Sequence, residues 1–427
     1  MKALSIEMVN FRQFERFECK FDPNFTLLMG QNGTGKTNLL QAMAIALSAP
    51  FHQIGLREVM LEEGDVRRDR SIDPANENWR AQIFPASCAI SVRLYNDPLT
   101  VAQERIPIGA RPFRIGQKPF DEHGRQTLVR RANDWFELNN AATIPLLARY
   151  GDTSALDVSA GDPIKKLFET KKDIWQRLVV DQVSAGDLAQ WFRFYELRTL
   201  QEGSAPLIYR VARQAVLKAI HVIDVKYVVR DNELMLLHED QGWRPFSQLS
   251  AGQRRIAAIF CDLALRCASL NSHRGEDCIV QTSGIVTIDE LDLHLHPAWQ
   301  REVVGDLRRV FPALQFIVTS HSPFLLQAAF EHGKVIDMRD GRFVEPGDTS
   351  IEDIAETVMG VPQPQRGQRF LELKQRAQEF YELLENQPVD AAAKVEAQQR
   401  LDAAMAVFAN DPASAAWLEQ RRLVAGP

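Results

Sequence analysis

A glycine-rich segment that ends in a lysine and a threonine is the clearest chemical feature of the sequence. Residues 30–37 read Gly-Gln-Asn-Gly-Thr-Gly-Lys-Thr and match the pattern G-x-x-x-x-G-K-S/T at every position. An apolar stretch precedes the segment and a stretch of helical periodicity follows it, which is the strand–loop–helix context that the pattern requires. Glycines let backbone N–H groups converge on phosphate oxygens, and the start of a helix adds partial positive charge. The segment therefore predicts a loop that binds nucleotide phosphates.

The residue types in this loop predict individual roles toward ATP and Mg²⁺. The Lys36 ammonium is expected to bridge the β- and γ-phosphates, and the Thr37 hydroxyl oxygen is expected to bind Mg²⁺. The alternative interpretation is a glycine turn with an exposed lysine. The residues expected to line the nucleotide are Gln31, Asn32, Gly33, Thr34, Gly35, Lys36, Thr37 and Asn38.

Two carboxylates, Asp289 and Glu290, directly follow an apolar strand expected over residues 284–288. Ligands of parallel sheets bind at the carboxyl ends of the strands. Asp289 is therefore expected to hold Mg²⁺, and Glu290 to orient or deprotonate the water that attacks the γ-phosphate. A second strand, expected over residues 315–320, leads into His321, which is expected to contact the γ-phosphate and the water. Glu290, His321 and Lys36 are thus the predicted catalytic residues.

Residues 249–253, Leu-Ser-Ala-Gly-Gln, precede a long apolar helix expected over residues 256–270. Ser250 is expected to cap this helix. The segment also resembles the signature of ATP-binding-cassette ATPases, and this resemblance implies that Ser250, Gly252 and Gln253 contact a nucleotide.

His294 and His296 have His-x-His spacing, which raises the question of a metal site. No cysteine or third histidine lies nearby in the sequence, so no dedicated transition-metal site is predicted.

The composition excludes several classes of protein. The chain has 427 residues, of which 45% are hydrophobic and 25% are charged, and its net charge is -6. It is therefore neither a disordered chain nor a generally basic nucleic-acid coat. Apolar runs are far shorter than the roughly 20 residues of a membrane span, and no secretion signal is visible. Five cysteines without a C-x-x-C pair indicate a reducing compartment. We expect a cytoplasmic protein without a membrane partner.

Apolar alternation and helical periodicity predict the elements that position these residues. Strands are expected over residues 5–14, 17–21, 25–29, 144–150, 284–288 and 315–320, with hairpins over 86–106 and 222–238. Helices are expected over residues 38–47, 256–270 and 365–427 and over most of 162–222, whereas residues 110–140 look polar and irregular.

Taken in order, the motifs resemble those of ABC-type ATPases of the SMC and RecF group. The phosphate loop, residues 249–253, Asp289-Glu290 and His321 occur in that group's order, and residues 10–14 resemble its opening strand, in which Arg12 lies beside the nucleotide. A narrower resemblance, carried by residues 145–151, 289–297 and 315–324, is to bacterial AAA-type ATP-binding proteins. These include the PtuA-like ATPases of Septu and retron defence systems and relatives of the OLD-family ATPase.

The resemblance implies an α/β P-loop NTPase of the ABC/SMC-head type, with a mixed β-sheet flanked by helices. It implies a core of residues 1–50 and 246–360, an inserted α+β and helical lobe over 51–245, and a helical C-terminal segment over 361–427 for oligomerisation or docking. In this group two heads sandwich two ATP molecules, so Ser250 and Gly252 are expected to act in trans. Asp292 is expected at the interface of a homodimer or a higher even oligomer.

The departures from the group suggest the biological role. The sequence shows neither the long coiled coil of SMC-type proteins nor the Toprim nuclease pattern of OLD nucleases. The chain therefore looks like an ATPase head that controls a separate effector, such as a nuclease, in anti-phage defence. The alternative is a RecF-like DNA-binding ATPase in repair. Its candidate DNA-facing arginines are Arg67, Arg68, Arg70, Arg125, Arg130 and Arg131. A transporter subunit is disfavoured, and Gln103 is a weak candidate for the family's glutamine loop.

Overall fold

The computed structural model describes residues 1–68, 82–105, 122–137, 142–151, 170–176, 185–345, 350–361, 372, 375–380, 396–397, 399–401 and 403. The chain divides into two compact units, Met1–Ile351 and Glu352–Pro427. Most of the helical segment expected over residues 361–427 lies outside the described residues. The described start of the second unit continues α10 (Ile351–Asp353) into a π-helix, η7 (Ile354–Val358).

A sheet built mainly of parallel strands forms the centre of the first unit. In the described part of the chain its order is β13 (Phe343–Val344), β12 (Lys334–Asp337), β3 (Phe25–Met29), β11 (Leu314–Thr319), β10 (Gly284–Ile288) and β6 (Leu146–Tyr150). Only the edge strand β13 runs antiparallel to its neighbour, so the sheet is mixed. Strands β3, β10 and β11 are buried along their whole length, which is typical of parallel strands covered on both faces.

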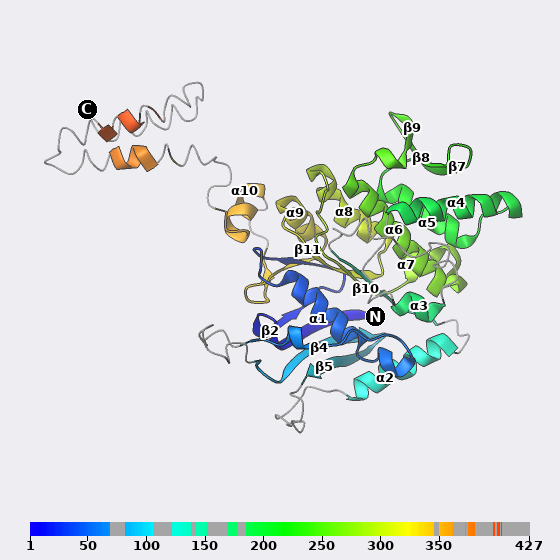
Figure 1. Cartoon of the computed structure of the whole chain (residues 1–427), viewed down its shortest axis with the longest axis horizontal. Coiled ribbons are helices and arrows are strands. Elements are labelled where there is room, and N and C mark those ends of the chain that lie inside the picture. Colours follow the sequence, from blue (N-terminus) through cyan, green and yellow to red (C-terminus); the bar gives the residue numbers. More distant parts are fainter. Residues whose placement is uncertain are drawn as a thin grey trace. The chain divides into compact units, whose positions relative to one another are not determined.

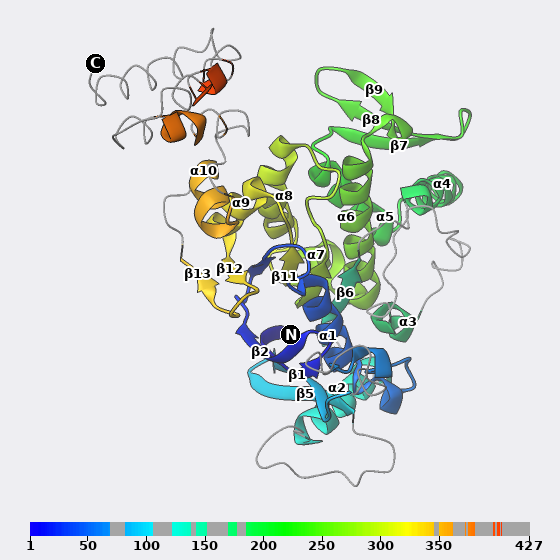
Figure 2. The same ribbon diagram turned by 60° about the vertical axis from the view of Figure 1, so that its left-hand side comes forward.

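Helices cover both faces of this sheet (Figures 1 and 2). Helix α1 (Lys36–Ser48) lies on one face, and α8 (Pro297–Val310) and α9 (Pro323–His332) lie on the other. Most residues of α1 are buried, because the helix also packs against strands β4 and β5 of a second sheet. A helix that is apolar on nearly all sides is stable only in such a position.

The second sheet is antiparallel, and its described strands have the order β2 (Phe14–Lys20), β1 (Lys2–Phe11), β4 (Ala86–Leu94) and β5 (Asp97–Arg105). The hairpin expected over residues 86–106 is confirmed. The strand expected over residues 5–14 is wrong at its end, because the chain turns after Phe11. Arg12 there has a φ of 49°, in the left-handed region, which ends the strand.

The buried side chain of Gln315 joins the two sheets. Its Nε2 donates to Ala3 O at 2.9 Å and to Asp22 O at 2.7 Å, and its Oε1 accepts from Ala3 N at 2.6 Å. A buried amide is stable only when its donors and acceptor are satisfied, so the contact fixes β1 against β11.

The helix α2 (Glu122–Glu137) contradicts the irregular structure expected over residues 110–140. Its buried side chains are Leu128, Ala132 and Trp135, at spacings of four and three residues that place them on one face. Polar residues between them obscured this periodicity in the sequence.

Further helices and a small antiparallel sheet complete the first unit. The remaining described helices are η1 (Phe51–Ile54), η2 (Glu63–Asp65), α3 (Lys171–Gln176), α4 (Ala185–Glu202), α5 (Leu207–Ala219), η5 (Phe246–Gln248), α6 (Ala251–Leu270), η6 (Ser272–Asp277) and α7 (Cys278–Gln281). The small sheet consists of β7 (Asp224–Val228), β8 (Glu233–His238) and β9 (Gly242–Pro245). The hairpin expected over residues 222–238 is confirmed, and β9 is a strand that the sequence interpretation missed.

The predicted fold class, an α/β P-loop head with a mixed sheet flanked by helices, is confirmed. Strand β6 comes from the segment between residues 51 and 245 and nevertheless pairs in parallel with β10 in the central sheet.

Candidate nucleotide site

The phosphate loop connects the end of β3 to the first residue of α1. Gly35 has a φ of 95°, and a Cβ atom at this position would lie 2.4 Å from Cζ of Phe14. Glycine is required here both by the left-handed backbone and by the close packing. Gly30 is similarly confined, because a Cβ atom there would lie 2.5 Å from Oγ1 of Thr34. The loop is thus held in a narrow turn at the carboxyl end of the central sheet.

Lys36 is turned back onto this loop. It is 7% exposed, and its Nζ donates to Gly30 O at 2.7 Å and to Gln31 O at 3.2 Å. The next residue, Thr37, is exposed in the first turn of α1. The ammonium and the hydroxyl therefore lie on the loop and at the start of the helix, where phosphate and Mg²⁺ bind in this motif.

The turn between β1 and β2 braces the loop from the side. Gln13 Nε2 donates to Gly33 O at 2.8 Å, and Gln13 Oε1 accepts from Asn38 Nδ2 at 3.0 Å. Arg12 donates to Asn38 Oδ1 at 2.5 Å and forms an ion pair with Asp65 at 2.8 Å. The structure thus brings Arg12 and Asn38 together beside the loop. Sequence reasoning missed Gln13, whose two partners, Gly33 O and the Asn38 side chain, lie 20 and 25 residues later in the chain.

Asp289 and Glu290 follow β10, next to the end of β11. Asp289 is 3% exposed, and its Oδ1 accepts a hydrogen bond of 2.5 Å from Thr319 Oγ1. Thr319 Oγ1 also accepts from the backbone nitrogen of Glu290 at 2.7 Å. Arg255 donates to the backbone oxygens of both acidic residues. Thr319 and Arg255 are therefore part of the site, and neither was identified from the sequence.

The electrostatics show that the charged groups share one environment. Burial lowers the pKa of Lys36, whereas the negative charges of Asp289, Glu290 and Asp292 oppose this shift. Burial, together with the positive charge of Lys36, lowers the pKa of His321, and Asp292 and Asp289 oppose that shift. The structure therefore brings together four residues predicted from distant segments, namely Lys36, Asp289, Glu290 and His321.

Asp292 contributes an unsatisfied atom to this environment. Its Oδ1 is buried and has no hydrogen-bond partner in the described structure. A buried carboxylate oxygen is costly unless it binds a donor or a cation. The residues expected to hold Mg²⁺ are Thr37, which is exposed, and Asp289, whose carboxylate is held by Thr319; both supply oxygen ligands, which are the type that Mg²⁺ prefers. These residues fit Mg²⁺ and a nucleotide.

Residues 249–253 form the start of α6. Ser250 is an N-cap whose Oγ accepts from Gln253 N at 3.2 Å, and the Gln253 side chain accepts from Ser250 N at 3.2 Å. The capping role expected for Ser250 is confirmed. Ser250 is exposed, and no hydrogen bond joins it to the phosphate loop of its own chain within the described residues. Gly252 packs against the Asp292–His296 segment, because a Cβ atom there would lie 2.3 Å from His294 O.

Gln103 does not belong to the site. It is buried in β5, where its Nε2 donates to Ile45 O at 2.9 Å and to Val59 O at 2.8 Å. Its Oε1 accepts from Leu61 N at 3.0 Å. The Gln103 amide thus joins α1 to residues 59–61. The assignment of Gln103 to the glutamine loop is therefore wrong.

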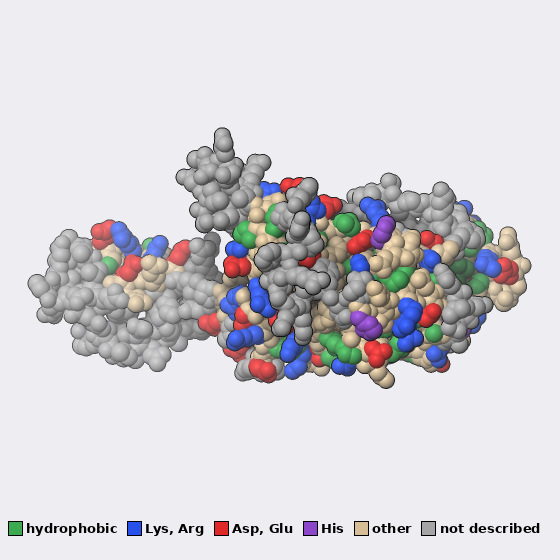
Figure 3. Space-filling view, turned by 90° about the horizontal axis from the view of Figure 1, so that it is seen from below, with side chains coloured by type: hydrophobic (Ala, Val, Ile, Leu, Met, Phe, Trp, Pro, Cys, Tyr) green, Lys and Arg blue, Asp and Glu red, His purple; other side chains and the backbone are tan. Residues whose placement is uncertain are grey.

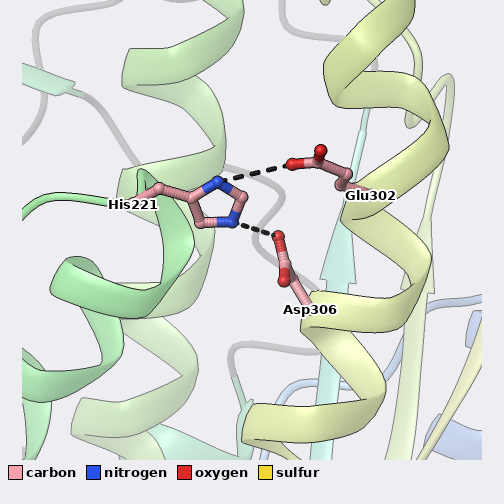
Figure 4. Close-up of side chains that lie close together, drawn as sticks. All are labelled: His221, Glu302 and Asp306. Carbon is pink, nitrogen blue, oxygen red and sulfur yellow. Dashed lines mark hydrogen bonds and ion pairs between the residues drawn. The ribbon is translucent and has the colours of Figure 1, made fainter.

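Potential transition-metal ligands gather elsewhere, around His221 (Figure 4). His221 Nε2 lies 2.8 Å from Asp306 Oδ2, and Nδ1 lies 3.4 Å from Glu302 Oε2. The ring also stacks on Trp299. Each ring nitrogen faces a different carboxylate. The arrangement therefore fits a set of polar contacts that links the segment after α5 to helix α8 better than it fits a metal centre. His296 caps α8 through its Nδ1, which accepts from Ala298 N.

Two family models match the chain. One, described as an AAA domain of AbiEii-toxin type from type IV toxin–antitoxin systems, matches residues 135–327. Another, described as an AAA domain, matches residues 5–74. These two ranges contain the phosphate loop, the start of α6, the acidic pair and His321. Over these two ranges the chain is similar to AAA domains. The identification of an ATPase from the sequence is thereby confirmed.

Proteins named for retrons and for Septu are similar to parts of this chain. A protein assigned as the ATPase of retron Ec83 from Escherichia coli is 46% identical over 76 residues, which cover 18% of this chain and 14% of that protein. The Septu protein PtuA of Bacillus thuringiensis is 23% identical over 317 residues, which cover 72% of this chain and 69% of PtuA. The resemblance to Septu and retron ATPases is confirmed, although the chain spans only a small part of the retron protein.

An SMC head domain from Thermotoga maritima aligns with 81% of this chain and with 100% of its own length. The sequence identity is 13% and the TM-score is 0.46, which is too low to support a conclusion about function.

No helix in the described part of the chain is long and apolar enough to span a membrane.

Proposed function

We propose that the AAA domain hydrolyses ATP with Mg²⁺ at the site described above. The observation that carries the proposal is the convergence of Lys36, Asp289, Glu290 and His321, three of them at the ends of neighbouring parallel strands, beside a complete phosphate loop. Phosphoryl transfer depends mainly on positioning and charge neutralisation, which this constellation supplies.

Each side chain has a distinct task in the proposed mechanism. The loop N–H groups and Lys36 hold the phosphates, and Glu290 orients the attacking water or accepts its proton. His321, whose lowered pKa favours the neutral ring, contacts the water and the γ-phosphate. Thr37 and Asp289 would hold Mg²⁺, which neutralises charge on the phosphates when bound. Arg12, Gln31, Asn32, Gly33, Thr34, Gly35 and Asn38 complete the cradle.

The exposed start of α6 supports a second part of the proposal. Ser250, Gly252 and Gln253 act in trans on ATP bound to another copy of the chain, which yields a homodimer or a higher even oligomer. Asp292 lies in the segment that packs against Gly252 and is placed at the same interface. Residues 1–50 and 246–360 then form the ATPase core, and 51–245 complete the head.

The relatives support a biological role in anti-phage defence. We propose that the ATPase controls a separate effector protein, such as a nuclease, and that residues 361–427 serve oligomerisation or docking. The relatives named for retrons and for Septu support this proposal, because the resemblance to ATPases of Septu and retron defence systems implies such a role.

The DNA-clamp alternative has weaker support. On the face in Figure 3, the described basic and acidic side chains are interspersed and form no continuous basic stripe. Of the candidate arginines, Arg67 pairs with Glu15 at 3.3 Å, and Arg70 lies outside the described residues. Proteins that neutralise several DNA phosphates need more concentrated positive charge.

The test measures ATP binding and steady-state hydrolysis of the wild type, Glu290→Gln and Lys36→Ala. Glu290→Gln should bind ATP, stall hydrolysis and accumulate a dimer on a sizing column. Lys36→Ala should lose ATP binding. Unchanged turnover in Glu290→Gln would remove Glu290 from its role. Assays with and without duplex and single-stranded DNA distinguish the alternatives, because stimulation by DNA that disappears at high salt would favour the clamp.

A further inference from the structure

Arg255 lies in the first turns of α6 and reaches the backbone of the acidic pair. The residue is 3% exposed. Its Nη1 donates to Glu290 O at 2.5 Å, and its Nη2 donates to Asp289 O at 2.7 Å. Nη2 also donates a longer bond of 3.4 Å to Gly151 O, just after β6. One planar group with a fixed fork of donors thus spans the ends of two neighbouring strands.

The backbone that Arg255 holds is unusual. Glu290 has a φ of 50°, a region that residues with a side chain rarely adopt. Such a conformation persists only where the surroundings fix it, and it tends to occur at functional sites. The bond from Nη1 to Glu290 O acts on this residue directly. Since the backbone sets the direction of the Cα–Cβ bond, the same bond restricts the region that the Glu290 carboxylate can reach.

Arg255 also connects two parts of the site. Ser250 begins the same helix and is exposed, and Gly252 packs against the backbone of His294. Arg255 thus links the helix that begins at Ser250 to the backbone of Asp289 and Glu290.

We propose that Arg255 is a positioning residue for ATP hydrolysis, which holds the backbone of Asp289 and Glu290 so that the Glu290 carboxylate meets the attacking water. This proposal rests on the proposed role of Glu290. It concerns the rate of the chemical step, because Arg255 contacts backbone oxygens of the acidic pair and not the phosphate loop.

The test compares Arg255→Met, Arg255→Lys and the control Arg266→Met in the full chain. Arg266 lies on the same helix, is also 3% exposed, and pairs with Asp262 at 2.6 Å, and its hydrogen bond to a backbone oxygen goes to Leu147. Binding of ATP, kcat, KM and the thermal midpoint are measured for each variant. Arg255→Met should lower kcat about ten- to a hundredfold with ATP affinity nearly unchanged, as small displacements of catalytic groups do.

The other variants make the result specific. Arg255→Lys keeps a charged donor and should recover part of kcat, whereas Arg266→Met should lower the thermal midpoint without a selective loss of kcat in the folded protein. Adding Arg255→Met to Glu290→Gln should cause no further loss of hydrolysis, because both changes remove the same function.

Several results would overturn the proposal. A wild-type kcat in Arg255→Met, a parallel loss of ATP affinity and kcat, or a further loss in the Glu290→Gln background would each do so. If Arg255→Met does not fold, Arg255→Lys decides, since a selective drop in kcat supports the proposal and an unchanged kcat contradicts it. If Glu290→Gln itself retains hydrolysis, the proposed role of Glu290 fails, whatever the Arg255 variants show.

Discussion

The hydroxyl of Thr319 lies 2.5 Å from Asp289 Oδ1 and 2.7 Å from the backbone nitrogen of Glu290. A hydroxyl donates one hydrogen and accepts through its lone pairs, so this group donates to Asp289 and accepts from Glu290. One atom at the end of β11 therefore orients the carboxylate expected to hold Mg²⁺ and fixes the residue expected to act on water.

Replacing Thr319 by Val should weaken both functions. The change leaves the Glu290 N–H without its partner and frees the Asp289 carboxylate, which should cost about 1–3 kcal/mol of folding free energy. The Mg²⁺ concentration for half-maximal hydrolysis should rise, whereas Thr319→Ser should behave like the wild type. Chemical denaturation and Mg²⁺ titrations of ATP hydrolysis measure the two effects.

Thr287 on β10 provides the matched control for this change. Its hydroxyl is buried and has no hydrogen-bond partner in the described structure. Thr287→Val therefore removes an unsatisfied group and should leave stability equal or higher. If the two valine variants had the same Mg²⁺ dependence, the specific role of Thr319 would be refuted.

Gly35→Ala should abolish nucleotide binding. The new Cβ atom would lie 2.4 Å from the Phe14 ring, and the φ of 95° would add strain. Gly55→Ala is the control, because Gly55 has a φ of 75° but no atom within 4 Å of the new Cβ. It should cost only the backbone strain, about 1–2 kcal/mol, and keep ATP affinity. Equal ATP affinities of the two variants, measured by calorimetry, would contradict the crowding argument.

Stability should fall as the pH drops below 6.5, partly because of His321. Burial and Lys36 lower its pKa in the folded protein, so the unfolded chain binds the proton more readily. The contribution is fully present above the unfolded pKa of about 6.5 and is lost as the pH falls toward the lower folded value. His321→Gln should flatten this part of the profile. Thermal midpoints between pH 7.5 and 5.5 test this, and parallel profiles would disprove it.

The five cysteines should be inert in the folded protein. All are buried, and burial raises the pKa of each thiol, in Cys278 to about 11. Since the thiolate is the reactive form, a thiol reagent at pH 8 should label none of them until the chain is unfolded. Labelling followed by mass spectrometry gives the count, and rapid modification of the native protein would contradict the expected burial.

The residues that carry contiguous motifs could be read from the sequence. Lys36, Asp289, Glu290 and His321 each follow a recognisable apolar segment, and the structure brings them together. Their chemical roles stay predictions. Thr319 and Arg255 could not be found in this way, because most of their partners are backbone atoms of a segment distant in the sequence. Side-chain patterns contain no information about such contacts.

The errors in the fold have similar causes. The first strand was extended too far because nothing in the residues 10–14 reveals that Asn10 and Arg12 adopt left-handed backbone angles. Helix α2 was missed because three buried side chains stand among charged ones. The position of β6 in the central sheet could not be predicted, because it depends on pairing with β10, which lies more than a hundred residues later in the chain.

The contact of Gln315 with Ala3 has a consequence during biosynthesis. The two residues are separated by 312 positions, so β1 leaves the ribosome long before its partner exists. At roughly 5–20 residues per second, this interval lasts on the order of 15–60 s. Throughout that time β3, which lies between β11 and β12 in the finished sheet, lacks both neighbours. Chaperone binding should therefore matter most while only the N-terminal half of the chain has been synthesised. β1 and β3 should reach their final places when β11 leaves the ribosome.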